Sequence, residues 1–359
     1  MAELGFAQRI DAATPAGRDR GIDALRAVAI VCIVLGHWLG TAWELNPYLV
    51  ISSPLAYLPG LAPATWVFQL LAVFFLVGGY VAARKARPLT ARLRKLLLPV
   101  VPLLLAWAVL AVLLVELNGQ PLRAVRVVAM PALGPLWFLA VYAALTVATP
   151  LLVRAGYGLV IAALCTVAAV DAGRFWLGGP QWLGWVNVLA AWAVPYQLGV
   201  IWGRGGLRGR GTAFALLGGG FCAAVALVVW AGYPASMVGV TGAPVSNLSP
   251  PTLAATCFAV GQVGLALLLK DPLARLMRRP RLWAATALVN LEAMWIFLWH
   301  QTALVLVVVV AFQQFGRPDS AGWILQRLGL IPVFAGTLGL MTWCRHRFDE
   351  RALVCDTVS

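Results

Sequence analysis

Long apolar segments recur along the whole chain and are separated by short stretches of polar residues, glycine and proline. A helix needs about 20 predominantly apolar residues to cross the hydrocarbon core of a bilayer. The segments that meet or approach this length are 22–43, 63–83, 96–116, 135–153, 155–171, 185–202, 212–231, 251–269, 285–310 and 323–344. The pattern therefore predicts an all-α integral membrane protein with about ten transmembrane helices.

The composition agrees with this fold class and excludes an ordinary soluble enzyme. Of the 359 residues, 62% are hydrophobic and only 11% are charged, and the mean hydropathy is +0.87. Soluble domains are far more polar than this. We expect a loosely ordered cytoplasmic tail at 1–20, a transmembrane domain at 21–345 and a second cytoplasmic tail at 346–359.

The net charge of +14 is explained by topology rather than by nucleic acid. With the N-terminus inside, most of the 27 basic residues fall on segments assigned to the cytoplasm, as the positive-inside rule requires. Arg26 and Arg327 lie within predicted spans, and the basic residues on the opposite side are Arg123, Arg126, Arg174 and Arg317. Both termini are therefore predicted to be cytoplasmic, and no nucleic-acid partner is expected.

Several kinds of catalytic site have no signature in the sequence. The six cysteines show no Cys-x-x-Cys spacing, and the chain contains no Walker loop, no Gly-x-Ser-x-Gly elbow and no His/Cys/Asp cluster with metal-ligand spacing. Hydrolase, ATPase and metalloenzyme functions are therefore disfavoured, and no metal cofactor is expected.

The first predicted span carries an arginine and a histidine in register. Arg26 and His37 are eleven residues apart, which places both on one helix face roughly 16 Å from each other. If Arg26 marks the inner boundary of the hydrocarbon core, His37 lies near the midplane. Ionisable groups at such depth usually mark a substrate or proton path, here one suited to an elongated anion entering from the cytoplasm. The alternative is that Asp23 and Arg26 pair at the interface while His37 only hydrogen-bonds a neighbouring span.

Polar residues also occur in the ninth span, 285–310. Glu292 and His300 are eight residues apart, which on one helix corresponds to about 12 Å. Glu292 could neutralise Arg26, and His300, with Gln301 beside it, could face the interior of the bundle. A core histidine that only satisfies a hydrogen bond is an equal alternative.

Two further sets of residues are candidates for binding substrate. The basic stretch between the second and third spans includes Arg92, Arg94 and Lys95, and residues 92 and 95 lie one helical turn apart, so that they could hold one phosphate group. Taken alone, these residues are explained more simply as an ordinary positive-inside cluster. Trp137 begins the fourth span and could either anchor it at the interface or line an acceptor pocket.

These segments resemble the membrane-bound acyltransferase-3 family, the ten-span O-acyltransferases of bacterial surface sugars and secondary metabolites. The most specific match is Asp23-Ala-Leu-Arg26 with His37 eleven residues after the arginine. Phe74-Phe-Leu-Val-Gly-Gly-Tyr80 is similar to the family's aromatic-Ser-Gly turn, with Gly78 where serine is common. Arg92-Leu-Arg-Lys95 resembles an R-x-x-R element that here ends in lysine. The later motifs are matched by Gly134-Pro-Leu-Trp-Phe-Leu139 and Ile296-Phe-Leu-Trp-His300-Gln.

The resemblance implies transfer of an acyl group, with acetyl favoured, from cytoplasmic acyl-CoA to a hydroxyl group of a glycan, glycolipid or natural product. It assigns the CoA phosphates to Arg26, with Arg92, Arg94 and Lys95 as weaker candidates. His37 becomes the general base or a transient acyl carrier, and His300 or Gln301 could face the developing oxyanion.

A transporter is the competing function. His37, Glu292 and His300 could relay protons through the membrane in a proton-coupled exporter. The preference for arginine over lysine and the many small residues suggest a GC-rich bacterial source, and hence a multi-pass protein of the bacterial plasma membrane that modifies envelope carbohydrate or an antibiotic.

Overall fold

The computed structural model describes residues 5–84, 88–311 and 314–358, with side chains up to residue 347. Residues 1–4 and 85–87, which belong to the predicted tail and basic stretch, and the side chains of 348–359 lie outside the described residues. Within the described part of the chain, nine helices are long and apolar enough to cross a membrane. The prediction of an all-α multi-pass membrane protein is confirmed.

The chain forms two compact units. Unit 1 comprises residues 1–33, 60–96 and 137–293, and unit 2 comprises residues 34–59, 97–136 and 294–359. The larger elements of unit 1 are α1 (Phe6–Ala12), the first part of α2 (Arg20–Gly40), α5 (Leu71–Arg84), α6 (Leu89–Leu97), α9 (Leu136–Phe175), α10 (Val186–Gly203), α11 (Arg210–Trp230), α12 (Leu253–Leu276) and α13 (Pro280–Leu291). Short turns of helix at Pro59–Ala64, Thr65–Phe68 (α4) and Gln181–Trp185 connect them.

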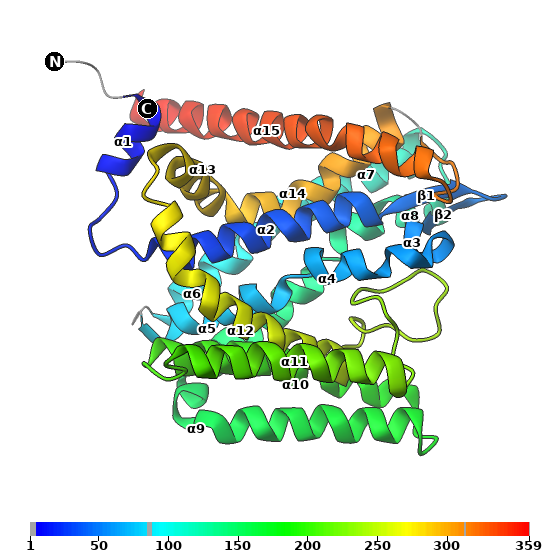
Figure 1. The fold of residues 1–359 in the computed structure, drawn as a ribbon. Coiled ribbons are helices and arrows are strands. Elements are labelled where there is room, and N and C mark those ends of the chain that lie inside the picture. The colour runs from blue at the N-terminus through cyan, green and yellow to red at the C-terminus, as the bar shows by residue number, and fades with distance from the viewer. Residues whose placement is uncertain (1–4, 85–87, 312–313, 359) are drawn as a thin grey trace. The chain divides into compact units, whose positions relative to one another are not determined.

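Glycines allow the helices of unit 1 to approach closely. α10 packs along α5, and α11 packs along α12 (Figure 1). A Cβ atom on Gly79 would lie 2.0 Å from the Tyr196 carbonyl oxygen, and one on Gly199 would lie 2.0 Å from the Leu76 carbonyl oxygen. Since apolar side chains gain little by associating in lipid, close backbone contact of this kind is a main source of helix association.

The long element α9 contains two helices. Its 40 residues are interrupted at Gly156, where φ is 57° and ψ is −149°, a conformation that only glycine adopts readily. The predicted spans 135–153 and 155–171 are the two parts on either side of this residue. Both predicted spans therefore count as a single helix among the nine spanning helices of the described residues.

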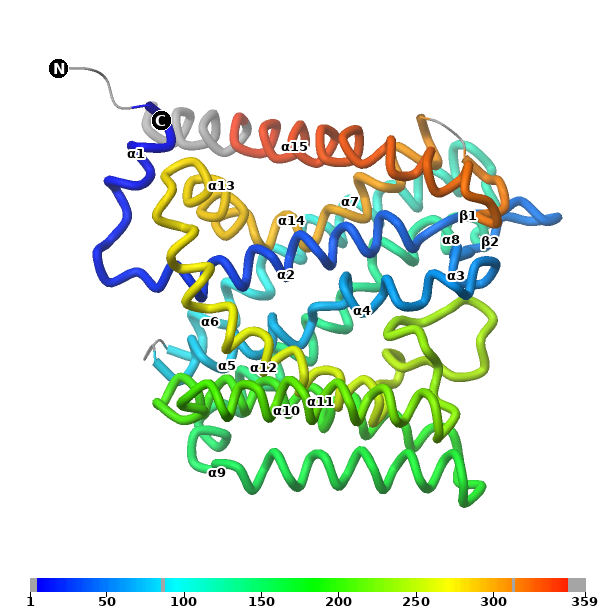
Figure 2. Tube along the Cα trace, viewed as in Figure 1, coloured from blue at the N-terminus to red at the C-terminus, as the bar shows by residue number. Residues whose placement is uncertain are grey.

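Unit 2 combines the end of α2 with a small hairpin and five further helices. The strands β1 (Ala42–Leu45) and β2 (Leu49–Ser52) pair antiparallel directly after α2, from Ala42 opposite Ser52 to Leu45 opposite Leu49 (Figure 2). The helices are α3 (Pro54–Tyr57), α7 (Val100–Val112) with a π turn at Leu113–Leu117, α8 (Leu122–Leu133), α14 (Ala293–Val305) with a π turn at Leu306–Ala311, and α15 (Ala321–Val358). Trp43 is fully buried, and its indole Nε1 donates to the Val127 carbonyl at 3.3 Å, which joins the hairpin to α8.

The ninth predicted span is not one helix. α13 ends at Leu291, Glu292 is its C-cap, and α14 begins at Ala293. The prediction that Glu292 and His300 share one helix is therefore wrong. The break follows Asn290, whose side-chain Nδ2 donates to the Thr286 carbonyl in the last turn and to the Asp23 carbonyl of α2. A side chain that bonds the helix backbone in this way competes with the helix's own ladder.

The N-terminal tail is more ordered than predicted. Residues 6–12 form α1, which packs against α13. The Trp283 indole Nε1 donates to the Thr14 hydroxyl at 2.7 Å, and Arg20 lies over the Trp283 ring, 4.7 Å from its centroid. Arg20 also pairs with Asp11 at 2.7 Å. These contacts fix a segment whose polar composition alone indicated a loose chain.

Candidate active site

Two histidines from distant parts of the sequence meet inside unit 2. His37 lies in the last turn of α2, and His300 lies in α14. His37 Nδ1 is 2.7 Å from His300 Nε2, and the two rings are nearly parallel, with an interplanar angle of 11° and a centroid separation of 5.0 Å. Sequence analysis singled out each histidine but did not predict that they touch.

Hydrogen-bond partners determine which ring nitrogens carry protons. His300 Nδ1 is 2.7 Å from the Phe297 carbonyl oxygen. A carbonyl only accepts, so His300 Nδ1 is the donor, and in the neutral ring His300 Nε2 is an acceptor. His37 Nδ1 must then donate to His300 Nε2, which leaves the lone pair of neutral His37 on Nε2. Assigned in this way, the pair presents one basic nitrogen.

The two histidine rings differ in how deeply they are buried. His300 is completely buried, whereas His37 is only partly buried. Among the described residues, none forms a hydrogen bond with His37 Nε2, and that atom is not sealed from solvent. The outer member of the pair therefore offers a free base to a molecule that reaches it, while the inner member is fixed by the protein.

The backbone around His300 is held by tryptophans. The Trp38 indole Nε1, next to His37, donates to the His300 carbonyl at 2.9 Å. Trp107 Nε1 of α7 donates to the Thr302 hydroxyl at 3.1 Å. Both contacts restrain α14 near the histidine, which reduces the reorganisation needed to keep the rings aligned.

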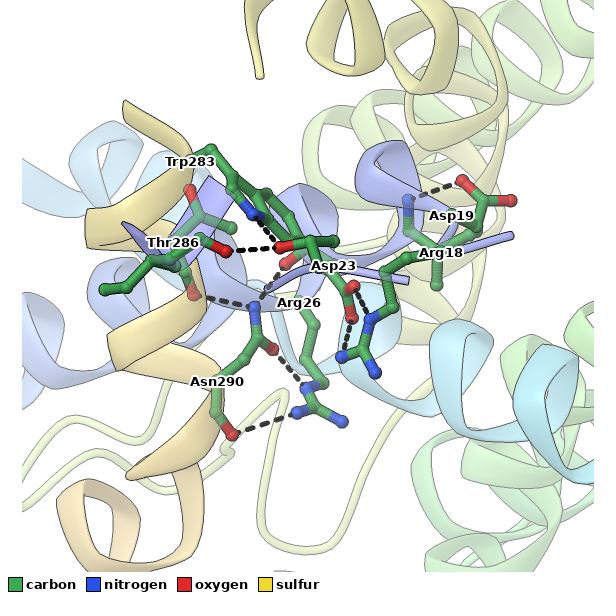
Figure 3. Close-up of polar contacts among 10 residues, drawn as sticks. Arg18, Asp19, Asp23, Arg26, Trp283, Thr286 and Asn290 are labelled. Carbon is green, nitrogen blue, oxygen red and sulfur yellow. Dashed lines mark hydrogen bonds and ion pairs between the residues drawn. The ribbon is translucent and has the colours of Figure 1, made fainter. Parts of the chain in front are cut away.

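Arg26, which lies eleven residues before His37 on α2, is oriented by an asparagine of α13 (Figure 3). Its Nε donates to the Asn290 side-chain oxygen at 2.5 Å, and its Nη2 donates to the Asn290 carbonyl at 3.1 Å. Asn290 Nδ2 in turn donates to the Asp23 carbonyl at 2.8 Å. Within the described chain Nη1 of Arg26 has no partner, so two N–H groups of an oriented cation remain for an anion.

The Asp23–Arg26 pair, which the sequence offered as an alternative, is not formed among the described residues. The Asp23 carboxylate is bound by Arg18, whose Nε and Nη2 both donate to it, the latter at 3.0 Å (Figure 3). Helical side chains lean toward the N-terminus of their helix, and in that direction Asp23 meets Arg18. Arg26 is drawn instead toward α13 by Asn290.

The remaining candidates of unit 1 are less closely organised. Glu292 is half-buried at the end of α13. The basic stretch forms the helix α6, on which Arg92 is half-buried and donates to the Ala82 carbonyl at 3.3 Å, while Arg94 and Lys95 are exposed. Trp137 is 36% exposed, and its ring lies 6.1 Å from that of Trp192.

Gly78 packs closely against an aromatic ring of α9. A Cβ on Gly78 would lie 2.6 Å from the Tyr142 ring, so a serine at this position would require that ring to move.

In unit 2, Gln301 is 3% exposed, and its Oε1 has no hydrogen-bond partner in the part of the chain that is described. A buried amide oxygen without a donor is costly unless a bound molecule supplies one.

Two polar centres in the spans were not predicted from the sequence. The first is Asn290, described above, the residue that orients Arg26. The second is Asp171 in α9, which is fully buried. Its Oδ1 accepts from Asn187 Nδ2 at 2.9 Å, and its Oδ2 accepts from the Tyr233 hydroxyl at 3.1 Å and the Leu253 backbone N–H at 2.7 Å. A carboxylate at the end of an apolar segment, three residues before Arg174, was the available signal.

Arg327, noted in the sequence only as a cation within a span, is 1% exposed in α15. Its guanidinium carbon lies 4.6 Å from the Trp323 ring centroid and 5.8 Å from that of Phe334. The aromatic faces stabilise this charge by cation–π attraction, which grows when the cation is desolvated.

Comparison with known proteins places this architecture in a family. No curated protein and no solved structure matches the chain. A family model described as an acyltransferase domain, that of the acyltransferase-3 family, matches residues 19–346. The match covers nearly the whole chain, including Arg26, His37, Asn290 and His300. The chain therefore belongs to the acyltransferase-3 family and is a multi-pass membrane acyltransferase.

Proposed function

We propose that this protein transfers an acyl group, acetyl in the first instance, from cytoplasmic acyl-CoA to a hydroxyl group of a sugar, glycolipid or secondary metabolite at the bacterial plasma membrane. The observation that carries the proposal is the free Nε2 of His37, the only nitrogen of the histidine pair left without a partner among the described residues. Family membership favours acyl transfer over the proton-coupled transporter.

His37 Nε2 accepts the proton of the acceptor hydroxyl as the oxygen attacks the thioester carbonyl. When the carbon–sulfur bond breaks, His37 returns that proton to the departing sulfur, so the base is regenerated. General-base assistance of this kind contributes about 10²–10⁴-fold in rate. A transient acyl group on the same Nε2 would use the same lone pair and stays open as the second form of the mechanism.

His300 acts through His37 and is a positioning residue. Because its Nδ1 proton is committed to the Phe297 carbonyl at 2.7 Å, His300 can only accept from His37. This keeps the His37 proton on Nδ1 and the lone pair on Nε2. It also stabilises the imidazolium that forms during transfer, as the hydrogen-bonded partner of a catalytic histidine does elsewhere.

Arg26 is the proposed donor-binding cation. Its Nη1 is unpartnered in the described residues, and Asn290 fixes the plane of the guanidinium, so it suits a phosphate oxygen of CoA. The same helix, α2, carries Arg26 and His37 roughly 16 Å apart, which suits an extended donor bound at one end and reacting at the other. Arg92, Arg94 and Lys95 are further candidates for the phosphates.

Gln301, in the same unit as the histidine pair, is proposed to contact the acceptor. The partly exposed ring of Trp137 in unit 1 is a separate candidate that offers a flat apolar surface to a sugar or a natural product. The unpartnered Oε1 of Gln301 could accept a hydrogen bond from an acceptor hydroxyl.

Replacing His37 tests the proposal directly. The purified full-length protein is incubated with radiolabelled acetyl-CoA and octyl glucoside, an amphiphilic sugar that serves as the hydroxyl probe, and acetylated glucoside and free thiol are measured. His37→Gln should lower both by about 10²–10⁴-fold because the base is lost. His346→Gln is the matched control, since this exposed histidine lies near the end of the last spanning helix and takes no part in the histidine pair. Transfer retained by His37→Gln, with the melting temperature unchanged, would remove His37 from the chemistry.

A further inference from the structure

An open pocket with a volume of about 700 Å³ lies at one end of the helices of unit 1. Its lining residues lie at the ends of α5, α10 and α12, in the loop that leads into α11 and at the start of α11. The positive-inside pattern assigns this end of the helices to the cytoplasm. The side chains that give the pocket its character are Arg84, Trp202, Arg208, Arg210, Lys270 and Arg275. None of them has a part in the proposed transfer.

The pocket is strongly cationic. Asp271 is the only acidic residue among those that line it. Lys270 is partly compensated by Asp19 at 3.4 Å. Arg208, Arg210 and Arg275 are exposed and have no ion pair among the described residues. Several like charges around one concave surface repel each other, and a bound anion relieves that repulsion.

The backbone of the loop adds to the attraction for an anion. Residues 205–209 alternate in the sign of φ, with 89° at Gly205, 52° at Leu207 and 86° at Gly209. Alternation of this kind can form a concave backbone surface that binds an anion through its N–H groups. The N–H groups of Gly205 and Gly206 donate to the Trp202 and Ile201 carbonyls, so those of residues 207–209 are the ones left for an anion. Leu207 is the only non-glycine residue of the described chain with a positive φ, so the loop holds this shape against its own preference.

The start of α11 lines the same pocket. Its N-cap is Gly209, which has no side chain to accept from the first N–H groups of the helix. An anion at such an end satisfies these donors and interacts favourably with the helix dipole. The Arg208 guanidinium is folded over the loop, with Nη2 2.8 Å from where a Cβ of Gly205 would lie.

The surroundings indicate an anion that carries hydrocarbon. Of the 21 residues of α11 only Ala213, Gly220 and Ala224 are buried and ten are exposed, so the protein leaves one face of this predicted span uncovered. Phe214, one turn after Arg210, lines the pocket and is 59% exposed. A phosphate in the pocket would thus continue directly into the apolar surface of a span. Basic pockets between spans at the cytoplasmic face bind lipid headgroups through this combination.

We propose that this pocket binds the phosphate-bearing headgroup of an anionic phospholipid, with the acyl chains lying along α11. Binding there would tie the 203–210 loop and the ends of α10, α11 and α12 to the inner leaflet. The inference is independent of acyl transfer, since it rests on a different cavity and on residues outside the proposed catalytic groups.

The test compares two lipids and two double variants that remove the same charge. Dioleoyl phosphatidylglycerol or dioleoyl phosphatidylcholine is titrated into the detergent-solubilised full-length protein, and bound lipid is counted by native mass spectrometry. Arg208→Gln with Arg210→Gln should weaken phosphatidylglycerol binding on the order of tenfold. Arg154→Gln with Arg278→Gln should not, because these exposed arginines do not line the pocket. Phosphatidylcholine should bind weakly to all three proteins.

Three outcomes would overturn the proposal. Equal binding of the two lipids would remove the role of the headgroup charge. An equal loss in both double variants would show a general surface-charge effect. Adenosine bisphosphate and inorganic phosphate are titrated in parallel, and if either binds through Arg208 and Arg210 while phosphatidylglycerol does not, the pocket belongs to a soluble phosphate compound. The melting temperatures of both double variants should equal that of the wild type, which checks that both remain folded.

Discussion

The Asp171 cluster of unit 1 and the histidine pair of unit 2 are both buried polar networks in predicted spans, yet they differ in how fully their hydrogen-bonding capacity is used. Asp171 receives three hydrogen bonds and lies 3.6 Å from Arg174 Nη1. The histidine pair forms an ordered chain that ends in an unused nitrogen on His37. Both oxygens of the Asp171 carboxylate are satisfied, although Asn187 Oδ1 and Arg174 Nε beside it are buried without a hydrogen-bond partner among the described residues. The reactive candidate of the histidine pair, His37, is itself open at one atom.

The difference suggests how structural and reactive polar groups can be told apart within a membrane protein. Asp171 joins α9 to the start of α12 and to the segment that contains Tyr233, so its bonds hold the chain together. Burial, followed by the neighbouring Asp171 carboxylate, raises the pKa of Tyr233 above its usual value, so the Tyr233 hydroxyl remains a donor. A saturated group has no capacity left for a substrate. His37 Nε2 and Arg26 Nη1 retain theirs.

The largest expected effect is on stability, from Asp171→Ala. The change leaves Asn187, Tyr233 and the Leu253 N–H without their acceptor and Arg174 without its counterion, which should cost about 3–5 kcal/mol. The measurement is the thermal unfolding of the solubilised protein. Tyr233→Phe removes one donor only and should cost about 1 kcal/mol. An Asp171→Ala protein that melts like the wild type but transfers acetyl slowly would place Asp171 in the chemistry. It would contradict the assignment of the Asp171 cluster as structural and the histidine pair as reactive.

The next effect is on catalysis, from His300→Phe. Without an acceptor for its Nδ1 proton, His37 no longer keeps its lone pair on Nε2, so kcat should fall about 10²-fold while KM for acetyl-CoA is unchanged. His300→Gln keeps an amide oxygen that can accept, and it should recover part of the rate. Steady-state kinetics of both variants provide the measurement. Equal rates in the two variants would show that His300 fills space and does not position His37.

The smallest effect is on donor binding, from Asn290→Ala. Losing the side-chain oxygen frees the Arg26 guanidinium to rotate, which should raise KM for acetyl-CoA by about tenfold with kcat near the wild-type value. Thr286→Ala, one turn earlier on α13, is the control because Thr286 does not contact Arg26. A fall in kcat at constant KM would contradict a role for Arg26 in holding the donor.

The spans were predictable because the bilayer sets their length. The predicted segments overlap the spanning helices, including the two that α9 joins through Gly156, but segment 285–310 runs across α13 and α14. The break at Glu292 was not predictable from hydropathy, since the apolar character continues across it. It depends on Asn290, and the Asn290 side chain reaches a backbone carbonyl of α2 that is 267 residues away.

The candidate site was predicted residue by residue but not as an arrangement. His37, His300 and Arg26 were singled out as costly groups in lipid, and their roles remain proposals. The contact between the histidines joins residues 263 positions apart, and the Arg26–Asn290 contact joins residues 264 positions apart. Helical periodicity describes neighbours within one helix only, so neither contact could be read from it.

Hydropathy and local spacing are properties of consecutive residues, so the amino-acid chain alone indicated the membrane fold, the family resemblance and the ionisable residues within the spans. Which of these residues have all their hydrogen bonds made within the protein and which do not became clear only from the folded structure. In the folded protein, Arg18 donates to Asp23, Arg26 donates to Asn290, and His37 Nδ1 donates to His300. A hydrogen bond depends on where two helices bring their atoms, and that position follows from the packing of the whole unit.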